Sequence, residues 1–454
     1  MLNFSAYVVC ILLFLTSSVR ADESGNGQAV FEIGIDRSNL NSTHNAWTLG
    51  PPAEPKIYPF NALYIKGKGL NPKTYEEVRK KILNGISQLH PKWFRDGFGD
   101  DNQKSIDLFI DEVSQVHALG MKMLAVFGQN NDDFDPNDYI PKEGSGCSWG
   151  TYPLSKINIP KFEQRLRDYF NALQKAGVSV DAFEVGNELD QYCNNADNPT
   201  NAEVAAHHWK FFMTPEQINT FASGYAPFLK AAAGLIREYF PKAQIITFGT
   251  SYPTSAPLIQ ALANVTDNSG NISDYTQLVD GYGSHLYPTS DTTLNMVQTV
   301  TKELIDQAAI LPHNDQKPIW ITEWNESGSV TWSNRKWPFG PVTATDGSDV
   351  DKNKADDQGV YPAMTRAQVI RTFYKDVILK LKNADNPVNI KNVFYYSYDS
   401  VASYKEAKLP IWNCDETVFN TSRGITGACY SGVIDPVTGQ LLPDIAAAVT
   451  NGAG

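Results

Sequence analysis

Eight short runs rich in β-branched and aromatic residues alternate along this chain with longer runs of helical periodicity. The β-rich runs begin at Phe31, Trp93, Met121, Asp181, Ala243, Leu278, Pro318 and Asn392. Several are almost continuously apolar, as expected for parallel strands covered on both faces. Because no Pro/Ser/Gly-rich linker interrupts the alternation, we predict one α/β domain, a (β/α)8 TIM barrel, rather than two domains.

Helical patterns and long connections separate these runs. A run from Thr74, which can cap a helix, repeats apolar residues at helical spacing, and the run from Lys104 ends at Gly120. Further helical patterns occupy 160–177, 215–240, 294–310, 363–384 and the segment before the C-terminus. The connections 129–159, 189–214 and 326–362 are long, and each follows a predicted strand. We therefore expect them at the C-terminal face of the barrel, where such enzymes have their sites.

Composition excludes several partners. The chain has 454 residues, of which 42% are hydrophobic, and a formal charge of -12 with a pI near 5.1. A net negative surface repels nucleic acid phosphates and anionic lipids, so neither nucleic acid nor a membrane is an expected partner. Carbohydrates, other small molecules and proteins remain compatible with this charge.

The first 21 residues resemble a signal peptide. An apolar run from Ala6 to Leu15 is too short to span a bilayer, and Val19-Arg20-Ala21 fits a signal peptidase site. Residues 1–21 are therefore predicted to be removed, which leaves 22–454 as the catalytic domain. The mature protein is expected to be secreted, or periplasmic in a bacterium.

Cysteines and glycosylation motifs fit secretion. After removal of Cys10, four cysteines remain, which allow three pairings, and short loops favour Cys147 with Cys193 and Cys414 with Cys429. No CxxC pair indicates a zinc or redox site. Five sequons, which a eukaryotic host could glycosylate, begin at Asn41, Asn264, Asn271, Asn325 and Asn420.

Two glutamates end predicted strands on roughly opposite sides of the barrel. Glu188 follows the fourth strand in "FEVGNELD", and Glu323 ends the seventh in "PIWITEWN". Two carboxyl groups that project into one barrel mouth can flank a small substrate. Glycoside hydrolysis needs such a pair, one as proton donor and one facing the anomeric carbon.

These two motifs resemble the fourth- and seventh-strand signatures of retaining glycoside hydrolases of clan A. The Gly-Asn-Glu and Glu-Trp-Asn residue patterns are similar to those of the arabinofuranosidase, β-xylosidase and heparanase-like β-glucuronidase families. The resemblance implies that Glu188 is the acid/base and Glu323 the nucleophile. It also implies that Asn187 hydrogen-bonds the 2-hydroxyl of the sugar.

Further positions fit the same resemblance. It implies that Arg95 in "WFRDG" hydrogen-bonds the nucleophile, and that His285 and Tyr287 in "GSHLYP" line the site. Trp324, beside Glu323, is an expected substrate contact. Many clan members have a strand-eight Trp below the sugar, and "VFYYSYDS" offers Tyr396 or Tyr398 instead.

The sequence thus predicts a secreted, retaining glycosidase that acts on oligo- or polysaccharides and needs no metal or other cofactor. His207-His208 are interpreted as loop residues, because no spaced carboxylate or Cys completes a metal-ligand set. Two alternatives stay open: a non-catalytic carbohydrate-binding protein on a degenerate barrel, and an inverting hydrolase, whose carboxyl groups stand about 6.5–9.5 Å apart.

Overall fold

The eight predicted strands form one parallel sheet in this computed structural model. The structure describes residues 31–36, 80, 82–98, 103–141, 147, 150–206, 212–266, 269–287, 293–325, 366–396, 398, 433 and 441–451. The strands are β1 (Glu32–Asp36), β2 (Trp93–Gly97), β3 (Lys122–Phe127), β4 (Ala182–Asn187), β5 (Gln244–Gly249), β8 (Tyr282–Leu286), β9 (Ile319–Trp324) and β10 (Ile390–Tyr396). Their spatial order is β5-β4-β3-β2-β1-β10-β9-β8. The (β/α)8 prediction is confirmed.

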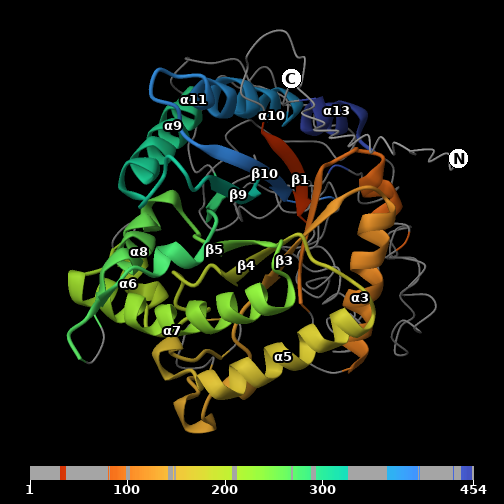
Figure 1. Cartoon of the computed structure of the whole chain (residues 1–454). Coiled ribbons are helices and arrows are strands. Elements are labelled where there is room, and N and C mark those ends of the chain that lie inside the picture. The colour runs from red at the N-terminus through yellow and green to blue at the C-terminus, as the bar shows by residue number, and fades with distance from the viewer. Residues whose placement is uncertain are drawn as a thin grey trace, which may run out of the picture.

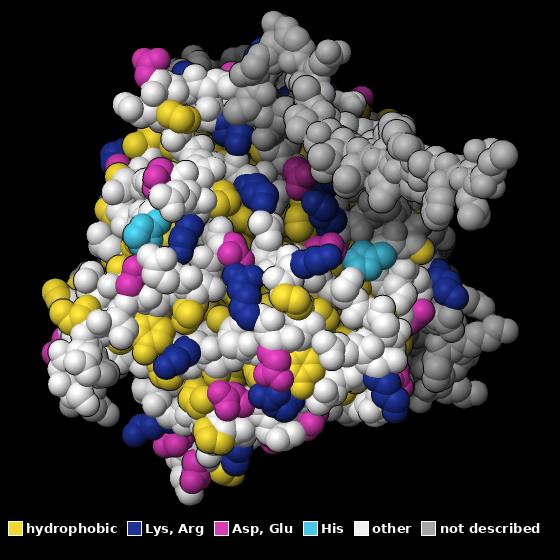
Figure 2. Space-filling view, viewed as in Figure 1, with side chains coloured by type: hydrophobic (Ala, Val, Ile, Leu, Met, Phe, Trp, Pro, Cys, Tyr) yellow, Lys and Arg dark blue, Asp and Glu magenta, His cyan; other side chains and the backbone are white. Residues whose placement is uncertain are grey.

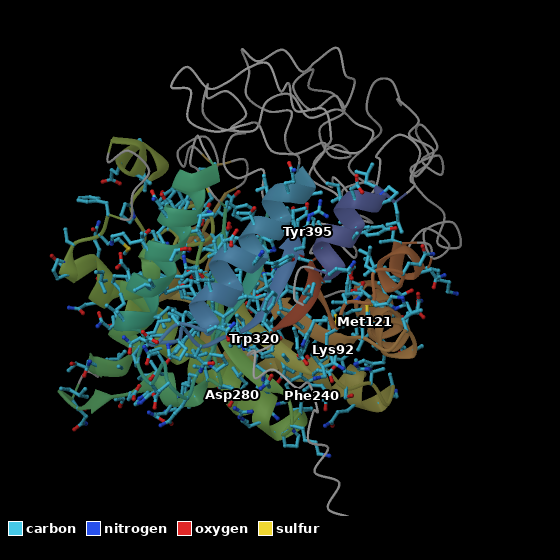
Figure 3. The ribbon with its side chains drawn as sticks, turned by 90° about the horizontal axis from the view of Figure 1, so that it is seen from above. Lys92, Met121, Phe240, Asp280, Trp320 and Tyr395 are labelled. Atoms are coloured by element: carbon cyan, nitrogen blue, oxygen red, sulfur yellow. A yellow bond between two sulfur atoms is a disulfide. The ribbon has the colours of Figure 1, made fainter. Side chains whose placement is uncertain are left out.

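The two outermost strands of that order meet and close the barrel. Parallel bridges join Ile246 of β5 to Gly281, and Thr250 to Ser284 of β8. Residues that precede strands, such as Lys92, Met121 and Asp280, lie toward one end of the molecule in Figure 3, and Tyr395, near the end of β10, lies toward the other. All carboxyl ends of the strands therefore face one mouth.

Helices surround the strands, as Figure 1 shows for α3, α5 and α7 on one side and α9 and α10 on the other. They are α3 (Gln103–Ala118), α5 (Ile159–Lys175), α6 (Asn201–Ala206), α7 (Pro215–Tyr239), α8 (Ala256–Ala261), α9 (Thr293–Ile310), α10 (Arg366–Thr372), the π-helical η9 (Phe373–Leu379), α11 (Lys380–Lys382) and α13 (Pro443–Asn451). A two-stranded hairpin, β6 (Val265–Thr266) and β7 (Ile272–Ser273), follows α8.

Local sequence explains where α5 begins and which face it buries. The Asn158 side chain accepts a hydrogen bond from the backbone N–H of Lys161, and Pro160 stands in the first turn, where its missing N–H costs nothing. Its buried residues recur at helical spacing and pack against the outer face of the barrel. These residues are Phe162, Leu166, Tyr169, Phe170 and Leu173.

Apolar side chains fill the barrel interior on the side away from the mouth, so the barrel is not a pore. They form one layer, which consists of Trp93, Leu124, Ala182, Ile246, Trp320 and Phe394. The Trp93 and Trp320 rings meet edge-on at a centroid distance of 5.1 Å. Two residues further along β2 and β4, the interior positions are Arg95 and Glu184, both fully buried. A charged layer therefore lies directly above the apolar one, toward the mouth.

Connections after β3 and β4 are tied together at the mouth by a disulfide between Cys147 and Cys193, which confirms that predicted pairing. Short 3-10 helices occupy parts of the connection after β3, and α6 lies in the connection after β4. The predicted signal peptide, the connection 326–362, the Cys414–Cys429 pair and His207-His208 lie outside the described residues.

The surface in Figure 2 carries Lys and Arg side chains interspersed with Asp and Glu, without one large basic patch on that face. None of the described helices combines the length and apolar character needed to cross a bilayer.

Candidate active site

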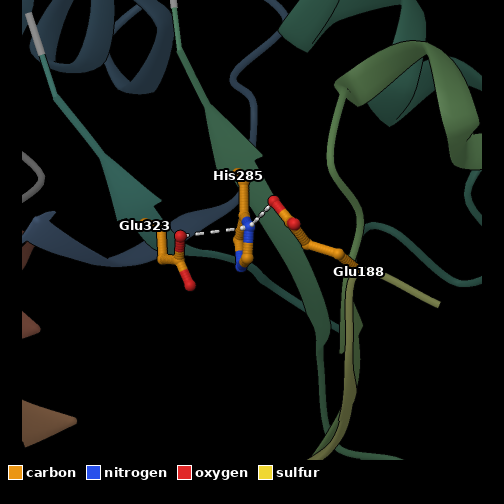
Figure 4. Close-up of side chains that lie close together, drawn as sticks. All are labelled: Glu188, His285 and Glu323. Carbon is orange, nitrogen blue, oxygen red and sulfur yellow. Dashed lines mark hydrogen bonds and ion pairs between the residues drawn. The ribbon is translucent and has the colours of Figure 1, made fainter. Parts of the chain in front are cut away.

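Glu188 and Glu323 meet at the barrel mouth with His285 between them (Figure 4). Glu188 follows β4 directly, Glu323 is the fifth residue of β9, and His285 belongs to β8. One carboxylate oxygen of each glutamate and one nitrogen of His285 all lie within 4.8 Å of one another. Glu188 and Glu323, which are 135 positions apart in the sequence, thus share one small site.

The backbone turns sharply where β4 ends. Gly186 has a φ of 100° and Glu188 a φ of 47°, so both adopt left-handed conformations. A Cβ at position 186 would lie 2.5 Å from Leu189 Cδ1, which explains the glycine. Glu188 is not a glycine, and this conformation costs on the order of 1–3 kcal/mol. A hydrogen bond of 2.9 Å from its N–H to the carbonyl of Gly249 helps to hold it.

Arg95 connects the nucleophile candidate to the strands around it. Its Nη1 donates to Glu323 Oε1 at 2.8 Å, and its Nη2 donates to Asn187 Oδ1 at 2.7 Å. Nε donates to Glu184 Oε2 at 2.6 Å, and Nη1 also donates to Asp36. Burial acts against the charge, but Asp36, Glu184 and Glu323 outweigh it and raise the pKa of Arg95 further. A permanent cation therefore faces Glu323.

Glu323 receives hydrogen bonds at both of its oxygens. Tyr287 donates its hydroxyl to Oε2 at 2.5 Å, while Arg95 occupies Oε1. Burial and the charge of Glu323 raise the pKa of Tyr287 well above 10, so this phenol keeps its proton. The two donors hold the Glu323 carboxylate in one orientation, which suits a nucleophile.

His285 contacts both glutamates through one nitrogen. Nδ1 lies 2.9 Å from Glu188 Oε1 and 3.4 Å from Glu323 Oε2. Burial acts to lower the pKa of His285, but the charge of Glu323 and the contacts with Glu184 and Glu188 outweigh it and raise the pKa to about 10. His285 is therefore an imidazolium at neutral pH; its Nδ1 donates to Glu188 Oε1 and makes a longer ion pair with Glu323.

Glu188 has a different environment from Glu323. Burial raises the pKa of Glu188, and the charges of Glu323 and Asp190 add to this, whereas the hydrogen bond from His285 acts in the opposite direction. Its side chain keeps 20% exposure, so a substrate can reach it. Gln191 donates to its Oε2 at 2.8 Å. A carboxyl with a raised pKa that stays accessible suits proton donation.

Two predicted substrate contacts have different outcomes. Trp324 is fully buried on the outer face of β9, where it stacks on Phe373 at 3.9 Å, so this prediction is wrong. Neighbouring strand residues point to opposite faces, and Glu323 occupies the inner one. Tyr396 lies at the mouth, 6.3 Å from the Tyr287 ring, whereas Tyr398 is 3% exposed and packs into the core.

The carboxylates and His285 also have the spacing of a metal site. Within the described part of the chain, Glu188, His285 and Glu323 form the group of candidate ligands. The guanidinium of Arg95, 2.8 Å from Glu323, would repel a cation at this position. The residues present fit acid–base chemistry better than metal binding.

Comparison with known proteins supports the same architecture. A GH5_18 protein from Bifidobacterium longum subsp. infantis superposes with a TM-score of 0.50 and 13% identity, over 93% of this chain and 78% of that one. A variant of GH5_18 from Bifidobacterium longum subsp. longum, in complex with Manβ1-4GlcNAc, gives a TM-score of 0.50 and 12% identity over the same shares. The fold is that of these glycoside hydrolases.

Other comparisons add little beyond the fold. The exo-β-1,4-mannosidase Op5Man5 from Opitutaceae bacterium strain TAV5 has a TM-score of 0.46 and 11% identity, and this chain spans 59% of its length. No protein-family model and no curated protein sequence matches the chain. At these identities the resemblance to clan A is confirmed at the level of the fold, and the chemistry has to be argued from the site.

Sequence reasoning missed two buried acids of this glycoside hydrolase-like barrel, Asp36 and Glu184. Both contact Arg95 and both are fully buried. A signal for Glu184 was present, because an acid in the middle of the apolar run "FEVG" must find a partner inside the protein. Asp36 is the last residue of β1, at a strand end like the residues that were identified.

Proposed function

We propose that this protein is a glycoside hydrolase that cleaves O-glycosidic bonds with retention of anomeric configuration. The observation that carries the proposal is that one carboxylate oxygen of Glu188 lies within 4.8 Å of one carboxylate oxygen of Glu323. Retaining enzymes hold their carboxyl groups about 5–5.5 Å apart, whereas inverting enzymes need about 6.5–9.5 Å to admit a water molecule. The short separation supports the retaining alternative.

In the first step, Glu188 gives its proton to the glycosidic oxygen while Glu323 attacks the anomeric carbon. The bond between that carbon and the leaving oxygen breaks, its electrons go to the oxygen, and a glycosyl ester forms on Glu323. The raised pKa of Glu188 keeps its proton available for this step. Arg95 and Tyr287, which donate to Glu323, hold its carboxylate in place for attack.

In the second step, Glu188 acts as a base. It removes a proton from a water molecule, which attacks the anomeric carbon and releases Glu323. Two inversions restore the original configuration. Asn187, held by Arg95 at 2.7 Å, is positioned at the mouth to contact the hydroxyl next to the anomeric carbon.

We further propose that the enzyme is secreted and acts on oligo- or polysaccharides. The signal-like segment 1–21 motivates the first part, and the disulfide between Cys147 and Cys193 supports it, because such bonds persist in oxidising compartments. N-terminal sequencing of the secreted protein should begin at Asp22. An intact Met1 on the exported protein would contradict the proposal.

Glycosylation is part of this proposal at only some of the sequons. Asn264 and Asn271 are exposed and remain candidates. Asn325 is 2% exposed, and its Nδ2 donates to the carbonyl of Tyr396, so we expect no glycan there. Peptide mapping with and without glycosidase treatment would check each position.

Hydrolysis by Glu188→Gln and Glu323→Gln variants tests the catalytic proposal. Each variant keeps the side-chain volume but loses the chemistry, so kcat on a responsive aryl glycoside should fall by roughly 10²–10⁴-fold or more. Circular dichroism should show an unchanged fold. Lys302→Gln, an exposed residue on α9, is a matched surface control and should keep wild-type turnover.

Two results would contradict the assignment. Near-wild-type turnover in either glutamate variant would remove that residue from the mechanism. Binding of glycans with no product from the wild-type protein, across a panel of aryl glycosides and polysaccharides, would instead favour the non-catalytic carbohydrate-binding protein.

A further inference from the structure

A third carboxylate, Glu184, lies beneath the catalytic pair and belongs to neither step of the mechanism. It is the third residue of β4 and is fully buried. Its Oε2 accepts from Arg95 Nε at 2.6 Å, and its Oε1 accepts from Thr322 Oγ1 at 2.9 Å. Its Oε1 also lies 3.9 Å from His285 Nε2.

Glu184 contacts the edges of Arg95 and His285 that face away from the catalytic pair. Arg95 offers Nε to Glu184 but Nη1 to Glu323. His285 presents Nε2 to Glu184 and Nδ1 to Glu188 and Glu323. One buried anion therefore backs both of the cations that touch the catalytic carboxylates.

The neighbouring strand leaves room for this arrangement. Gly249 ends β5, and a Cβ at this position would overlap His285 Nε2 and lie 2.5 Å from Glu184 Oε1. A real Cβ essentially never comes so close to another heavy atom. The absence of a side chain at position 249 is thus required for Glu184 and His285 to face each other.

The charges around Glu184 and His285 come from several elements of the barrel. Burial acts to raise the pKa of Glu184, but Arg95 and His285 outweigh it and lower the pKa, so this carboxyl is ionised. The titratable or charged groups that face this pair are Asp36 from β1, Arg95 from β2, Glu188 after β4, Tyr225 from α7, Tyr287 after β8 and Glu323 from β9.

We propose that Glu184 is a positioning residue, which anchors Arg95 and His285 from behind so that both cations face Glu188 and Glu323 throughout the reaction. The inference rests on the proposed retaining mechanism. An unpaired buried charge costs several kcal/mol. An imidazolium between two carboxylates that change charge therefore benefits from a third carboxylate whose charge does not change.

The catalytic cycle shows why a fixed counter-ion matters. Before reaction, Glu323 is negative and Glu188 holds a proton. In the glycosyl-enzyme, Glu323 is a neutral ester, and Glu188 is negative because its proton has gone to the leaving oxygen. His285 Nδ1 is within 3.4 Å of both, so it keeps one anionic neighbour in each state without moving. Glu184 remains the constant partner on the other side.

Glu184→Gln tests the inference, because it removes the charge and keeps the volume. We expect kcat to fall by about 10- to 100-fold with KM nearly unchanged, since misplacing a catalytic group by about 1 Å costs roughly 100-fold. Nitrogen chemical shifts of the His285 ring, followed by NMR against pH, should show its titration at lower pH than in the wild type. Glu184→Asp, which keeps the charge, should retain a titration close to that of the wild type.

Asp133→Asn is the matched control. Asp133 is also a buried acid, 1% exposed, and it pairs with Arg165 at 2.7 Å in the connection after β3. This variant should lose stability but keep the His285 titration. If Glu184→Gln left both kcat and the His285 titration unchanged, the inference would be wrong.

An equal loss of kcat in the Glu184 and Asp133 variants, with His285 unmoved in both, would reduce Glu184 to a structural residue and also overturn the inference. If Glu184→Gln fails to fold, Gly249→Ala carries the test, because its Cβ would separate Glu184 Oε1 from His285 Nε2. An unchanged kcat and an unchanged His285 titration in that variant would contradict the role. The NMR readout needs no turnover. Failure of the retaining mechanism itself would appear separately, as activity in the Glu188→Gln or Glu323→Gln variants.

Discussion

Glu188 and Glu323 are chemically identical side chains that the site makes different. Glu323 receives the guanidinium of Arg95 and the phenol of Tyr287, both of which donate to its oxygens. Burial raises the pKa of Glu188, and the negative charges of Glu323 and Asp190 raise it further. Opposed environments of this kind assign the nucleophile and the acid.

Replacement of His285 by Asn should move the alkaline limb of the kcat/KM profile to higher pH. The imidazolium lowers the pKa of Glu188, so its loss raises that pKa and keeps the acid protonated at higher pH. Turnover should also fall, because the imidazolium no longer orients either carboxylate. His117→Asn, at a half-exposed pair with Asp181, is the control and should leave the profile in place. A limb that stays put or moves to lower pH in His285→Asn would contradict this account.

Substitution of Trp324 tests whether this side chain packs in the core or binds substrate. Because its ring is buried against Phe373 and donates to the Tyr374 hydroxyl, Trp324→Ala should lower the free energy of unfolding by about 3–5 kcal/mol. KM of the folded fraction should not change. Tyr396→Ala, at the mouth, should raise KM with a smaller loss of stability. Urea unfolding and steady-state kinetics measure both, and a raised KM with unchanged stability in Trp324→Ala would return this residue to the site.

At the scale of elements, the apolar strand patterns were sufficient to predict the barrel. All eight β-rich runs became strands, and 215–240, expected to be helical, became α7 (Pro215–Tyr239). Strand ends then placed Glu188, Glu323, Arg95 and His285 correctly at one mouth. The orientation of one side chain was predicted wrongly. Side chains alternate between the two faces of a strand, so Trp324 lies on the face opposite to Glu323, and the resemblance of the motifs did not show this.

Other details depended on contacts between strands, which no local pattern encodes. The pairing of β8 with β9 shifts register between Ser284 and His285. The left-handed conformation at Glu188 is a second example. Both determine where catalytic atoms point, and both arise from long-range packing, so the sequence predicted which residues meet but not how they are held.

Strand β5 allows a direct test of the packing that surrounds His285. Gly249→Ala should destabilise the protein by about 1–3 kcal/mol and lower turnover, because its Cβ would displace His285 or Glu184. Gly128→Ala, just after β3, is a matched control, since a Cβ there meets no atom within 4 Å. Thermal unfolding and kcat of both variants should differ accordingly. Equal behaviour of the two would show that the site tolerates a shift of the imidazole.

At the scale of the whole molecule, a closed barrel brings distant segments to one rim, and a covalent link then stabilises the connections above it. The Cys147–Cys193 bond spans 46 positions and joins the connections after β3 and β4. Closing a loop of that size stabilises a protein by roughly 2–4 kcal/mol.

Reduction of the disulfide should therefore lower the unfolding temperature measurably. The Cys147→Ser/Cys193→Ser double variant should unfold at a lower temperature than the oxidised wild type. Its response to reductant should be smaller, because only the predicted Cys414–Cys429 pair remains to be reduced. Differential scanning calorimetry with and without dithiothreitol makes the comparison. A reductant-dependent shift of the same size in the double variant would place the effect at another bond.

The central claim is that Glu188 and Glu323 act on one sugar from the two sides of a short gap. The most direct measurement is the anomeric configuration of the first product, followed by proton NMR during hydrolysis of a responsive aryl glycoside. The account predicts a product with the configuration of the substrate, together with a mechanism-based fluoroglycoside label on Glu323 in peptide mass spectra. A first product of opposite configuration, or a label on a residue other than Glu323, would contradict it.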